Sequence, residues 1–384
     1  MNFEFATATR ILFGPGTSQQ LPQIAAAFGQ NIFVVTGADR SRQAALWSAL
    51  EQKGLNLTFF TVRGEPTTFD IVTGLEWARQ AGCEVVVGIG GGSVLDAGKA
   101  IAALLTNGGQ PLDYLEVIGR GQPLTRPSAP YIAVPTTAGT GAEVTRNAVL
   151  ASPEHRVKVS LRSPLMLPAV AVVDPDLTRA MSPALTAYTG LDALTQLIEP
   201  FVSNKANPLT DALCREGIPR AAWALRRAYR DGSNAAAREA MSLASLLGGL
   251  ALANAGLGAV HGFAGPIGGL FPAPHGAICA RLLPLVMANN VHALQERDPD
   301  HTALPRYQEV ARLLTGQAAA TIADGVAWVE SLCADLKIPS LATWGVTEAD
   351  CSTLIAQAQK ASSMKANPIR LTETELGDML LQAL

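Results

Sequence analysis

Four side chains in the second half of the chain are of types that bind metal ions: Asp192, Gln196, His261 and His275. Asp192 and Gln196 are four residues apart in a helix-like segment, so they share one helix face. Carboxylate and carboxamide oxygens and neutral imidazole nitrogens can hold Zn²⁺ or Fe²⁺. Taken singly, each histidine fits a core or helix-capping role better. The residues alone therefore make a four-residue metal site a hypothesis.

A glycine run forms a second candidate site. Gly88-Ile-Gly-Gly-Gly-Ser93 lies where a strand-like run ends and a helix-like segment begins. Glycine lets backbone amides approach a ligand closely, and a helix N-terminus favours an anion. The spacing matches neither the GxGxxG fingerprint nor the GxxxxGK[ST] loop. The run predicts a phosphate-binding turn, and a tight turn that simply needs glycine is the alternative.

A polar loop follows the next strand-like run, with Thr136, Thr137 and Thr140 between Pro135 and Glu143. Ligands of open α/β folds bind at the carboxyl edge of the sheet, where these hydroxyls would lie. The alternative is a helix cap, with Thr140 at the N-cap and Glu143 three residues later. Two such loops after successive strands favour nucleotide binding.

The secondary structure expected around these residues changes near residue 176, from alternating strands and helices to helices alone. Up to there, apolar runs alternate with helix-like segments, which predicts βαβ units and a parallel sheet. The expected strands are Asn31–Thr36, Leu57–Val62, Glu84–Gly88, Tyr131–Val134 and Val170–Val173, and the expected helices are Ile71–Ala81 and Ser93–Leu105. We therefore expect an α/β nucleotide-binding domain over residues 1–176.

Residues 177–384 are rich in Ala and Leu with helical periodicity and predict an all-helical domain. The expected helices are Thr186–Val202, Asn207–Tyr229, Ala235–Gly256, Cys279–Glu296, Pro305–Leu314, Thr321–Leu336 and Thr347–Ala361. Met241–Val260 has no charged residue, but its serines, asparagine and glycines favour a buried helix over a membrane span.

Composition excludes several classes of protein. The 384 residues are 48% apolar and 16% charged, with a net charge of −3. This apolar content argues against disorder, and without a basic excess we expect no nucleic-acid partner. Five scattered cysteines without a CxxC pair indicate a reducing compartment, so we expect a cytoplasmic protein. The low surface charge favours a homodimer.

Five strings of the sequence resemble those of the iron-containing (group III) alcohol dehydrogenase family. They are GGGSVLDAGKAIA (90–102), PTTAGTGAEVTRNAV (135–149), VVDPDLT (172–178), GLDALTQLIEPFVS (190–203) and HGFAGPIGGLFPAPHG (261–276). They occur in the family's order, and the similarity extends from about Gly14 to Pro368. The resemblance implies a nucleotide-binding domain, a helical domain and an active site in the cleft between them.

The resemblance also implies roles for individual residues. Asp192, position 196, His261 and His275 correspond to the family's four metal ligands. The implied coenzyme contacts are Gly90, Gly91, Gly92, Ser93, Asp96, Thr136, Thr137, Thr140, Asn147 and Lys158.

This chain departs from the family at two positions near the metal. Position 196 is normally histidine, and here Gln196 offers a weaker oxygen ligand, so we expect weaker metal binding. Many relatives have a further histidine four residues after His261, where this chain has Gly265. A proton relay through that side chain is therefore unavailable.

A third departure concerns the coenzyme. NAD-preferring members often have an aspartate just after the first strand, where this chain has Gly37. An acid there would bind the ribose 2′-hydroxyl and repel a 2′-phosphate. Gly37 leaves room, and Arg40 and Arg42 can reach an anion, whereas Asp39 argues for NAD. The balance leans to NADP over NAD.

Together these features predict a metal-assisted NAD(P)-dependent oxidoreductase that interconverts a primary or secondary alcohol and an aldehyde or ketone. Asp192, His261 and His275 are the expected catalytic residues, with Fe²⁺ or Zn²⁺ weakly bound and a small-molecule substrate. Two alternatives stay open: a metal-free reductase similar to the maleylacetate reductases, which Gln196 favours, and a nucleotide-binding relative without catalysis.

Overall fold

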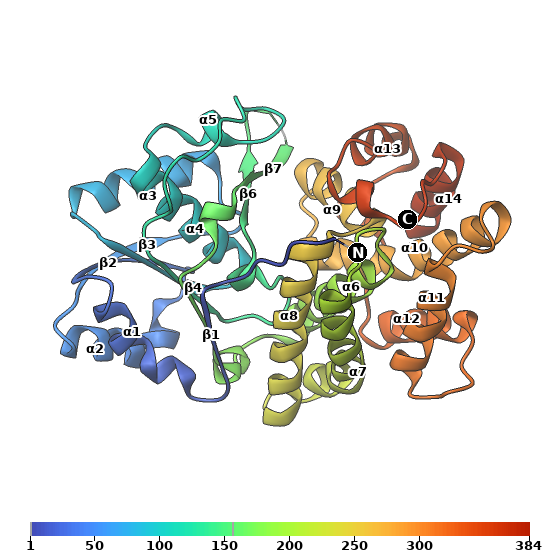
Figure 1. Cartoon of the computed structure of the whole chain (residues 1–384), viewed down its shortest axis with the longest axis horizontal. Coiled ribbons are helices and arrows are strands. Elements are labelled where there is room, and N and C mark those ends of the chain that lie inside the picture. The colour runs from blue at the N-terminus through green and yellow to red at the C-terminus, as the bar shows by residue number, and fades with distance from the viewer. Residues whose placement is uncertain (1, 156) are drawn as a thin grey trace. The chain divides into compact units, whose positions relative to one another are not determined.

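The computed structural model describes residues 2–155 and 157–384, which form two compact units (Figure 1). The α/β unit comprises Ala6–Thr137 and Gly141–Arg179. The helical unit comprises Ala180–Leu384, to which Ala138–Thr140 and the N-terminal segment up to Phe5 also belong. An α/β unit with a parallel sheet and a helical C-terminal part confirm the predicted fold class.

The α/β unit is built on a six-stranded sheet with the order β1-β8-β5-β4-β2-β3, in which every neighbouring pair is parallel. Its strands are β1 (Arg10–Phe13), β2 (Asn31–Thr36), β3 (Asn56–Thr61), β4 (Val85–Gly90), β5 (Tyr131–Pro135) and β8 (Val170–Val173). The sequence analysis predicted five of them and missed β1. It also missed an antiparallel ribbon of β6 (Asn147–Ser152) and β7 (Val157–Arg162).

Helices cover both faces of this sheet, which explains why its central strands are apolar at consecutive positions. The helices of the unit are α1 (Leu21–Ala26), α2 (Ala44–Gln52), α3 (Thr68–Gln80), α4 (Gly92–Asn107) and the short α5 (Pro111–Tyr114). Phe33 and Val35 of β2 share a buried cluster with α3 and α4. Ile32 and Val34 face the other way, into a cluster with Leu21 of the α1 segment and Trp47 of α2.

The strand order changes direction between β2 and β4. The chain passes from β2 outward to β3, and then returns to place β4 on the other side of β2. In open α/β sheets, ligands bind beyond the carboxyl ends of the strands at such a switch point. Gly37 and Gly91 follow the two strands that flank it, β2 and β4.

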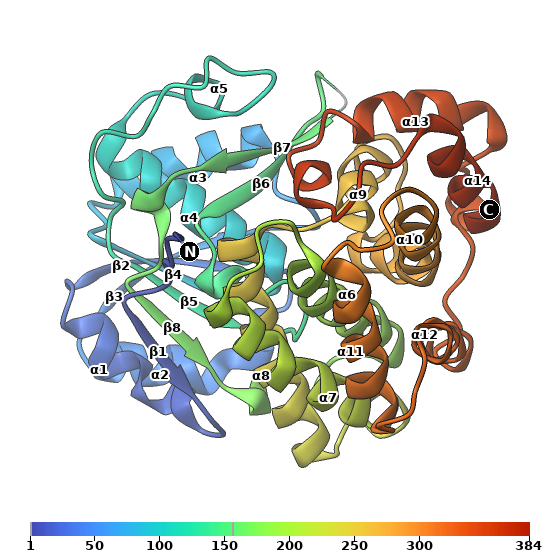
Figure 2. The ribbon, with the colours of Figure 1, turned by 45° about the vertical axis from the view of Figure 1, so that its right-hand side comes forward.

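The helical unit is organised around α6, which is buried at every position from Gly190 to Val202 (Figure 2). Its helices are α6 (Pro183–Val202), α7 (Pro208–Arg230), α8 (Ala235–Ala255), α9 (Ala259–Leu270), α10 (His275–Arg297), α11 (Ala303–Thr315), α12 (Ile322–Asp335), α13 (Cys351–Ala358) and α14 (Glu373–Ala383). The sequence analysis did not predict α9 or α14.

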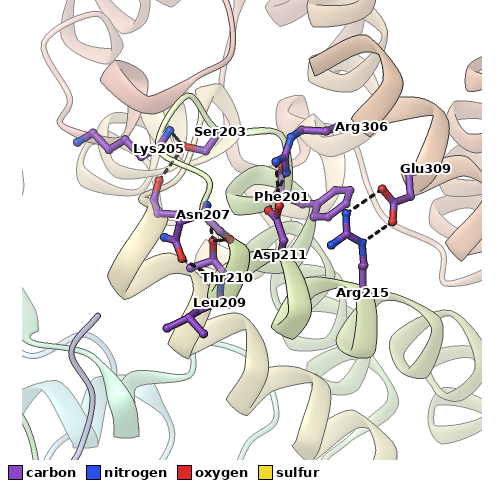
Figure 3. Close-up of polar contacts among 11 residues, drawn as sticks. Phe201, Ser203, Lys205, Asn207, Leu209, Thr210, Asp211, Arg215, Arg306 and Glu309 are labelled. Atoms are coloured by element: carbon purple, nitrogen blue, oxygen red, sulfur yellow. Dashed lines mark hydrogen bonds and ion pairs between the residues drawn. The ribbon is translucent and has the colours of Figure 1, made fainter. Parts of the chain in front are cut away.

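The C-terminal end of α6 is clamped by ion pairs and cation–π contacts, as Figure 3 shows. Arg306 of α11 donates to the Phe201 carbonyl oxygen at 2.7 Å and pairs with both carboxylate oxygens of Asp211 on α7. The guanidinium carbons of Arg306 and Arg215 each lie 5.2 Å from the Phe201 ring centre. Arg215 is itself paired with Glu309. This clamp fixes the helix that carries Asp192 and Gln196.

The long uncharged run at Met241–Val260 is not one continuous helix. Gly256, with a φ of +71°, ends α8, and α9 begins three residues later at an angle of 99°. Within the described residues, α10 is long and apolar enough to span a membrane, yet 72% of its apolar window is buried inside the protein. That burial is typical of a core helix.

Candidate metal centre and coenzyme-binding edge

Three helices bring Asp192, His261 and His275 together in the helical unit. Asp192 lies in the middle of α6, His261 in the first turn of α9, and His275 at the first position of α10. The Nε2 atoms of His261 and His275 lie 3.3 and 3.7 Å from the same carboxylate oxygen, Asp192 Oδ1. This convergence is the one that the family resemblance implies.

The first turn of α10 approaches α6 closely because residue 276 is glycine. A β-carbon built on Gly276 would lie 2.4 Å from the carbonyl oxygen of Tyr188, one turn before Asp192 on α6. No side chain fits at that separation. Gly276 therefore lets the neighbouring His275 reach the Asp192 carboxylate.

A fourth potential ligand, Cys279, lies in the same cluster and was not predicted from the sequence. It is one helical turn after His275 on α10, and its Sγ lies 3.7 Å from the Nε2 atoms of both His261 and His275. One ligand atom from each of Asp192, His261, His275 and Cys279 fits within a mutual separation of 4.8 Å.

Glu199 is a second residue of the site that the sequence analysis did not assign. Its Oε2 lies 2.6 Å from His261 Nδ1, and its Oε1 accepts the Val260 amide hydrogen at 2.8 Å. A carboxylate on Nδ1 fixes the ring so that Nε2 faces the cluster, the arrangement common for metal-bound histidine. Glu199 is seven residues after Asp192, two turns along the same helix face, and this spacing was visible in the sequence.

Gln196 lies buried one turn after Asp192, and its side chain lowers the pKa of the Asp192 carboxyl. Because a carboxylate only accepts hydrogen bonds, the group of Gln196 that stabilises it is the amide nitrogen. Gln196 Oε1 and Asp192 Oδ1 are both buried without a hydrogen-bond partner. Buried oxygens are rarely left in this state, so the cluster fits a bound cation. The prediction that Gln196 itself binds the metal is not tested by these contacts.

The charges around the cluster also favour a cation. Burial would raise the pKa of the Asp192 carboxyl, but His275, His261 and the Gln196 hydrogen bond outweigh it and lower the pKa. Burial would lower the pKa of His275, but the neighbouring Cys279 and Asp192 raise it to about 9. The anionic groups of the cluster thus stabilise positive charge on its imidazoles, and the same groups would attract a metal cation.

Position 265, where many relatives have a histidine, is open in this structure. Gly265 lies one turn after His261 on α9, and a β-carbon built there would meet no atom within 4 Å. Among the described residues, no neighbouring atom would prevent a larger side chain at this position.

The candidate coenzyme-binding residues of the α/β unit lie at the carboxyl edge of the sheet. Gly90 and Pro135 are paired neighbours at the ends of β4 and β5, and the Thr136 amide donates to the Gly90 carbonyl at 2.9 Å. The adjacent α4 begins at Gly92, and no side chain caps its first amides. A β-carbon on Gly91 would lie 3.3 Å from the Thr137 side chain and would fill part of this edge.

The glycine turn thus fits a pyrophosphate group. Uncapped amides at a helix N-terminus bind anions, and the glycines keep the approach to them clear. Gly90, Gly91, Gly92, Ser93, Thr136 and Thr137 are all gathered here. Thr140 is grouped with the helical unit.

Asp96, Asn147 and Lys158 have other neighbours. Asp96 pairs with the buried Lys99 at 3.1 Å and accepts the Val149 amide hydrogen, and Lys99 also donates to the Asn147 carbonyl. Asn147 and Lys158 lie towards opposite ends of the β6–β7 ribbon, and Lys158 pairs with Glu65 at 3.5 Å. Asp96 therefore anchors this ribbon to α4.

The segment after β2 shows how the predicted coenzyme determinants are arranged. A β-carbon on Gly37 would meet nothing within 4 Å. The Asp39 carboxylate caps the next turn through Ser41 and pairs with Arg42 at 3.0 Å. The Arg40 guanidinium stacks on the Phe59 ring, 4.9 Å from its centre.

A parallel sheet with a glycine-rich carboxyl edge, together with a histidine–carboxylate cluster, is typical of proteins that bind a nucleotide and a divalent metal ion. Comparison with known proteins identifies the family. Residues 8–175 match the family described as iron-containing alcohol dehydrogenase, and residues 186–384 match the C-terminal part of the Fe-containing alcohol dehydrogenase family.

Individual relatives agree with this match. The chain is 38% identical over 337 residues to 1,3-propanediol dehydrogenase of Klebsiella pneumoniae, covering 87% of this chain and 85% of that protein. It is 34% identical over 371 residues to alcohol dehydrogenase 4 of Schizosaccharomyces pombe, covering 95% and 85%. A crystal structure of 1,3-propanediol oxidoreductase superposes with a TM-score of 0.92 at 34% identity over 100% of both chains.

The chain belongs to the iron-containing alcohol dehydrogenase family. It is an alcohol dehydrogenase that transfers hydride between a small alcohol or aldehyde and NAD(P) with the help of a divalent metal ion. These findings confirm the predicted family, fold class and reaction.

Proposed function

We propose that Asp192, His261 and His275 hold the divalent metal of this enzyme and that the substrate oxygen binds there. The observation that carries this proposal is the approach of both histidine Nε2 atoms, at 3.3 and 3.7 Å, to one partnerless carboxylate oxygen. A divalent ion bound there supplies Lewis-acid polarisation of the substrate oxygen.

The surrounding residues serve to hold this arrangement. Asp192 contributes a formal negative charge, Glu199 keeps His261 in the tautomer that leaves Nε2 unprotonated, and Gln196 orients the Asp192 carboxylate through its amide nitrogen. Gln196 is one helical turn after Asp192, and its Oε1 atom is buried without a hydrogen-bond partner. In our proposal this oxygen binds the metal weakly. With Gly265 on α9, the alcohol proton leaves through solvent or the coenzyme ribose and not through a side chain at that position.

For the coenzyme we propose NADP(H). Support comes from the open space at Gly37 and from the engagement of the Asp39 carboxylate by Ser41 and Arg42, which leaves it less suited to bind a ribose hydroxyl. The proposed pyrophosphate contacts are the backbone amides of Gly91–Ser93, with Thr136, Thr137, Thr140, Asn147 and Lys158 contributing further along the coenzyme.

The coenzyme proposal is tested by the ratio of kcat/KM for NADPH to that for NADH. We expect Gly37→Asp to lower this ratio about tenfold or more, because the new carboxylate repels a 2′-phosphate. Gly37→Ala, which adds volume without charge, is the matched control and keeps the ratio. A wild-type preference for NADH would contradict the proposal.

For the substrate we propose a short primary alcohol or diol and its aldehyde. Support comes from the relatives named 1,3-propanediol dehydrogenase, which cover 87% of this chain. The test is aldehyde reduction across a series of chain lengths, where kcat/KM should peak at short aldehydes and fall for bulky or dicarboxylate substrates. We further propose a cytoplasmic location, in keeping with five cysteines that form no disulfide, and a homodimer, in keeping with the low content of charged residues.

A further inference from the structure

We propose that Cys279, in place of Gln196, is the fourth strong protein ligand of the metal, so that the strong donors are one carboxylate, two imidazoles and one thiolate and Gln196 Oε1 is only a weak contact. This inference rests on the metal site proposed above and extends it. It predicts a metal with affinity for sulfur, Zn²⁺ in preference to Fe²⁺.

Four of the six separations between the donor atoms are close to the edges of a tetrahedral arrangement around one ion, and the other two are within 4.8 Å. Bonds of about 2.0–2.1 Å to nitrogen or oxygen and about 2.3 Å to sulfur require edges of about 3.3 Å between nitrogen and oxygen and about 3.5 Å between nitrogen and sulfur. The edges from Asp192 Oδ1 to the His261 and His275 nitrogens are 3.3 and 3.7 Å. Those from Cys279 Sγ to the same nitrogens are both 3.7 Å.

The surroundings of Cys279 differ from those of other cysteines in the chain. Its side chain is fully buried and has two imidazole nitrogens beside the sulfur. Cys333 and Cys351 instead donate to backbone carbonyls, and Cys214 is packed in the apolar core. A buried sulfur between two histidines is placed to share a cation with them.

The donor at position 196 explains why a thiolate would be needed. Gln196 is neutral, and its side chain stabilises the Asp192 carboxylate. Without Cys279 the site would have one anionic ligand and two imidazoles, whereas a thiolate supplies a second negative charge and a stronger bond than a carboxamide. The helix spacing allows it, because His275 and Cys279 are four residues apart on α10 and face the same side.

Cobalt substitution tests the inference directly. The full-length protein is stripped with a chelator and titrated with Co²⁺ alone, and the absorption spectrum is recorded. We expect one Co²⁺ per chain, ligand-field bands in the visible range and a sulfur-to-cobalt charge-transfer band in the near ultraviolet.

Variants assign the band to one sulfur. Cys279→Ser should abolish the charge-transfer band. It should also weaken Zn²⁺ binding by more than about 10–100-fold, because losing a residue that only hydrogen-bonds to a ligand already costs that much. The loss for Fe²⁺ should be smaller, so the ratio of Zn²⁺ to Fe²⁺ affinity falls. Cys83→Ser, in the α/β unit, should leave the spectrum and both affinities unchanged.

A double variant shows whether any loss of metal binding in Cys279→Ser comes from misfolding. Gln196→His combined with Cys279→Ser should recover tight Zn²⁺ binding without the charge-transfer band. Stoichiometric cobalt binding without that band in the wild-type protein would overturn the role of Cys279 and leave the metal site intact. Failure of the wild-type protein to bind cobalt at all would overturn the metal site and this inference together.

Discussion

In the helical unit, the candidate site consists of buried side chains whose donor atoms converge: Asp192, His261, His275 and Cys279 from three helices. In the α/β unit, the candidate site consists of backbone, and its distinguishing feature is the absence of side chains at Gly91 and its neighbours. The first site depends on which chemical groups are present, and the second on which volumes are empty. The two sites should therefore respond to mutation in different ways.

Buried charge is also handled differently in the two units. Asp192 has two imidazoles and an amide around its carboxyl group, and these lower its pKa in spite of burial. Glu143, equally buried in the α/β unit, has its pKa raised to about 7 because burial outweighs the charge of Lys99. The Asp192 carboxylate in the candidate metal site is thus kept ionised, whereas Glu143 in the α/β unit stays protonated below neutral pH.

The largest effect is expected from removing either histidine of the cluster. His261→Ala or His275→Ala should lower kcat/KM for aldehyde reduction by about 10³-fold or more, because Lewis-acid stabilisation is worth several kcal/mol. Steady-state kinetics and metal analysis check this. His292→Ala, an exposed histidine on the same helix as His275, should keep wild-type activity and metal content. Near-normal rates in either cluster variant would contradict the mechanism.

Glu143 should produce a pH-dependent stability effect. Its pKa is near 4.5 in the unfolded chain and about 7 in the folded protein. Between these values only the unfolded state releases the proton, so its ionisation costs stability as pH rises from 4.5 to 7, up to about 3 kcal/mol in total. Glu143→Gln should therefore stabilise the protein at pH 8 and have little effect at pH 4.5. Urea unfolding at both pH values checks this, and an equal effect at the two would contradict it.

Glu199 contacts His261, and at the proposed site it would therefore affect metal binding through that ring. Glu199→Gln should weaken metal binding about 10–100-fold, since a carboxylate on Nδ1 makes the ring a better ligand. Metal dissociation constants from chelator competition measure this. The fold-change in metal affinity should exceed the fold-change in KM for the coenzyme, because the proposed coenzyme contacts lie in the α/β unit. Unchanged metal affinity would remove Glu199 from the site.

The smallest effect is expected at the glycine edge. Gly91→Ala adds a methyl group 3.3 Å from the Thr137 side chain, so the fold should accept it while the coenzyme loses space. We expect KM for the coenzyme to rise about tenfold with metal content unchanged. Gly377→Ala in α14, whose β-carbon would lie 3.8 Å from Ile355 in α13, is the control and should leave KM unchanged. A wild-type KM in Gly91→Ala would argue against a coenzyme contact there.

Much of this fold follows from local sequence patterns, because buried strands and amphipathic helices have distinct periodicities. β2, β4, α4 and α6 were predicted close to their observed bounds. α9 was missed because its residues 262–269 include four glycines and Pro266, which are poor helix formers. The β6–β7 ribbon was overlooked although Val157, Val159 and Leu161 alternate with polar residues, which is the period of a half-buried strand.

The candidate metal site could be predicted from local sequence patterns only in part. The residue types alone made Asp192, Gln196, His261 and His275 a hypothetical metal site, but only the family resemblance gave each of them a role as ligand. Cys279 was missed because the helix was predicted to begin at that residue, whereas α10 begins at His275. The four-residue spacing that places the sulfur beside the imidazole depends on that earlier start.

The most direct test of the account is the metal content of the full-length protein, purified without chelators or an affinity tag, measured beside NADPH oxidation with short aldehydes. The account predicts a near-stoichiometric divalent ion, loss of aldehyde reduction on chelation and recovery when the ion is restored. Rapid aldehyde reduction by protein that contains no metal would contradict it and would favour the metal-free reductase that Gln196 first suggested.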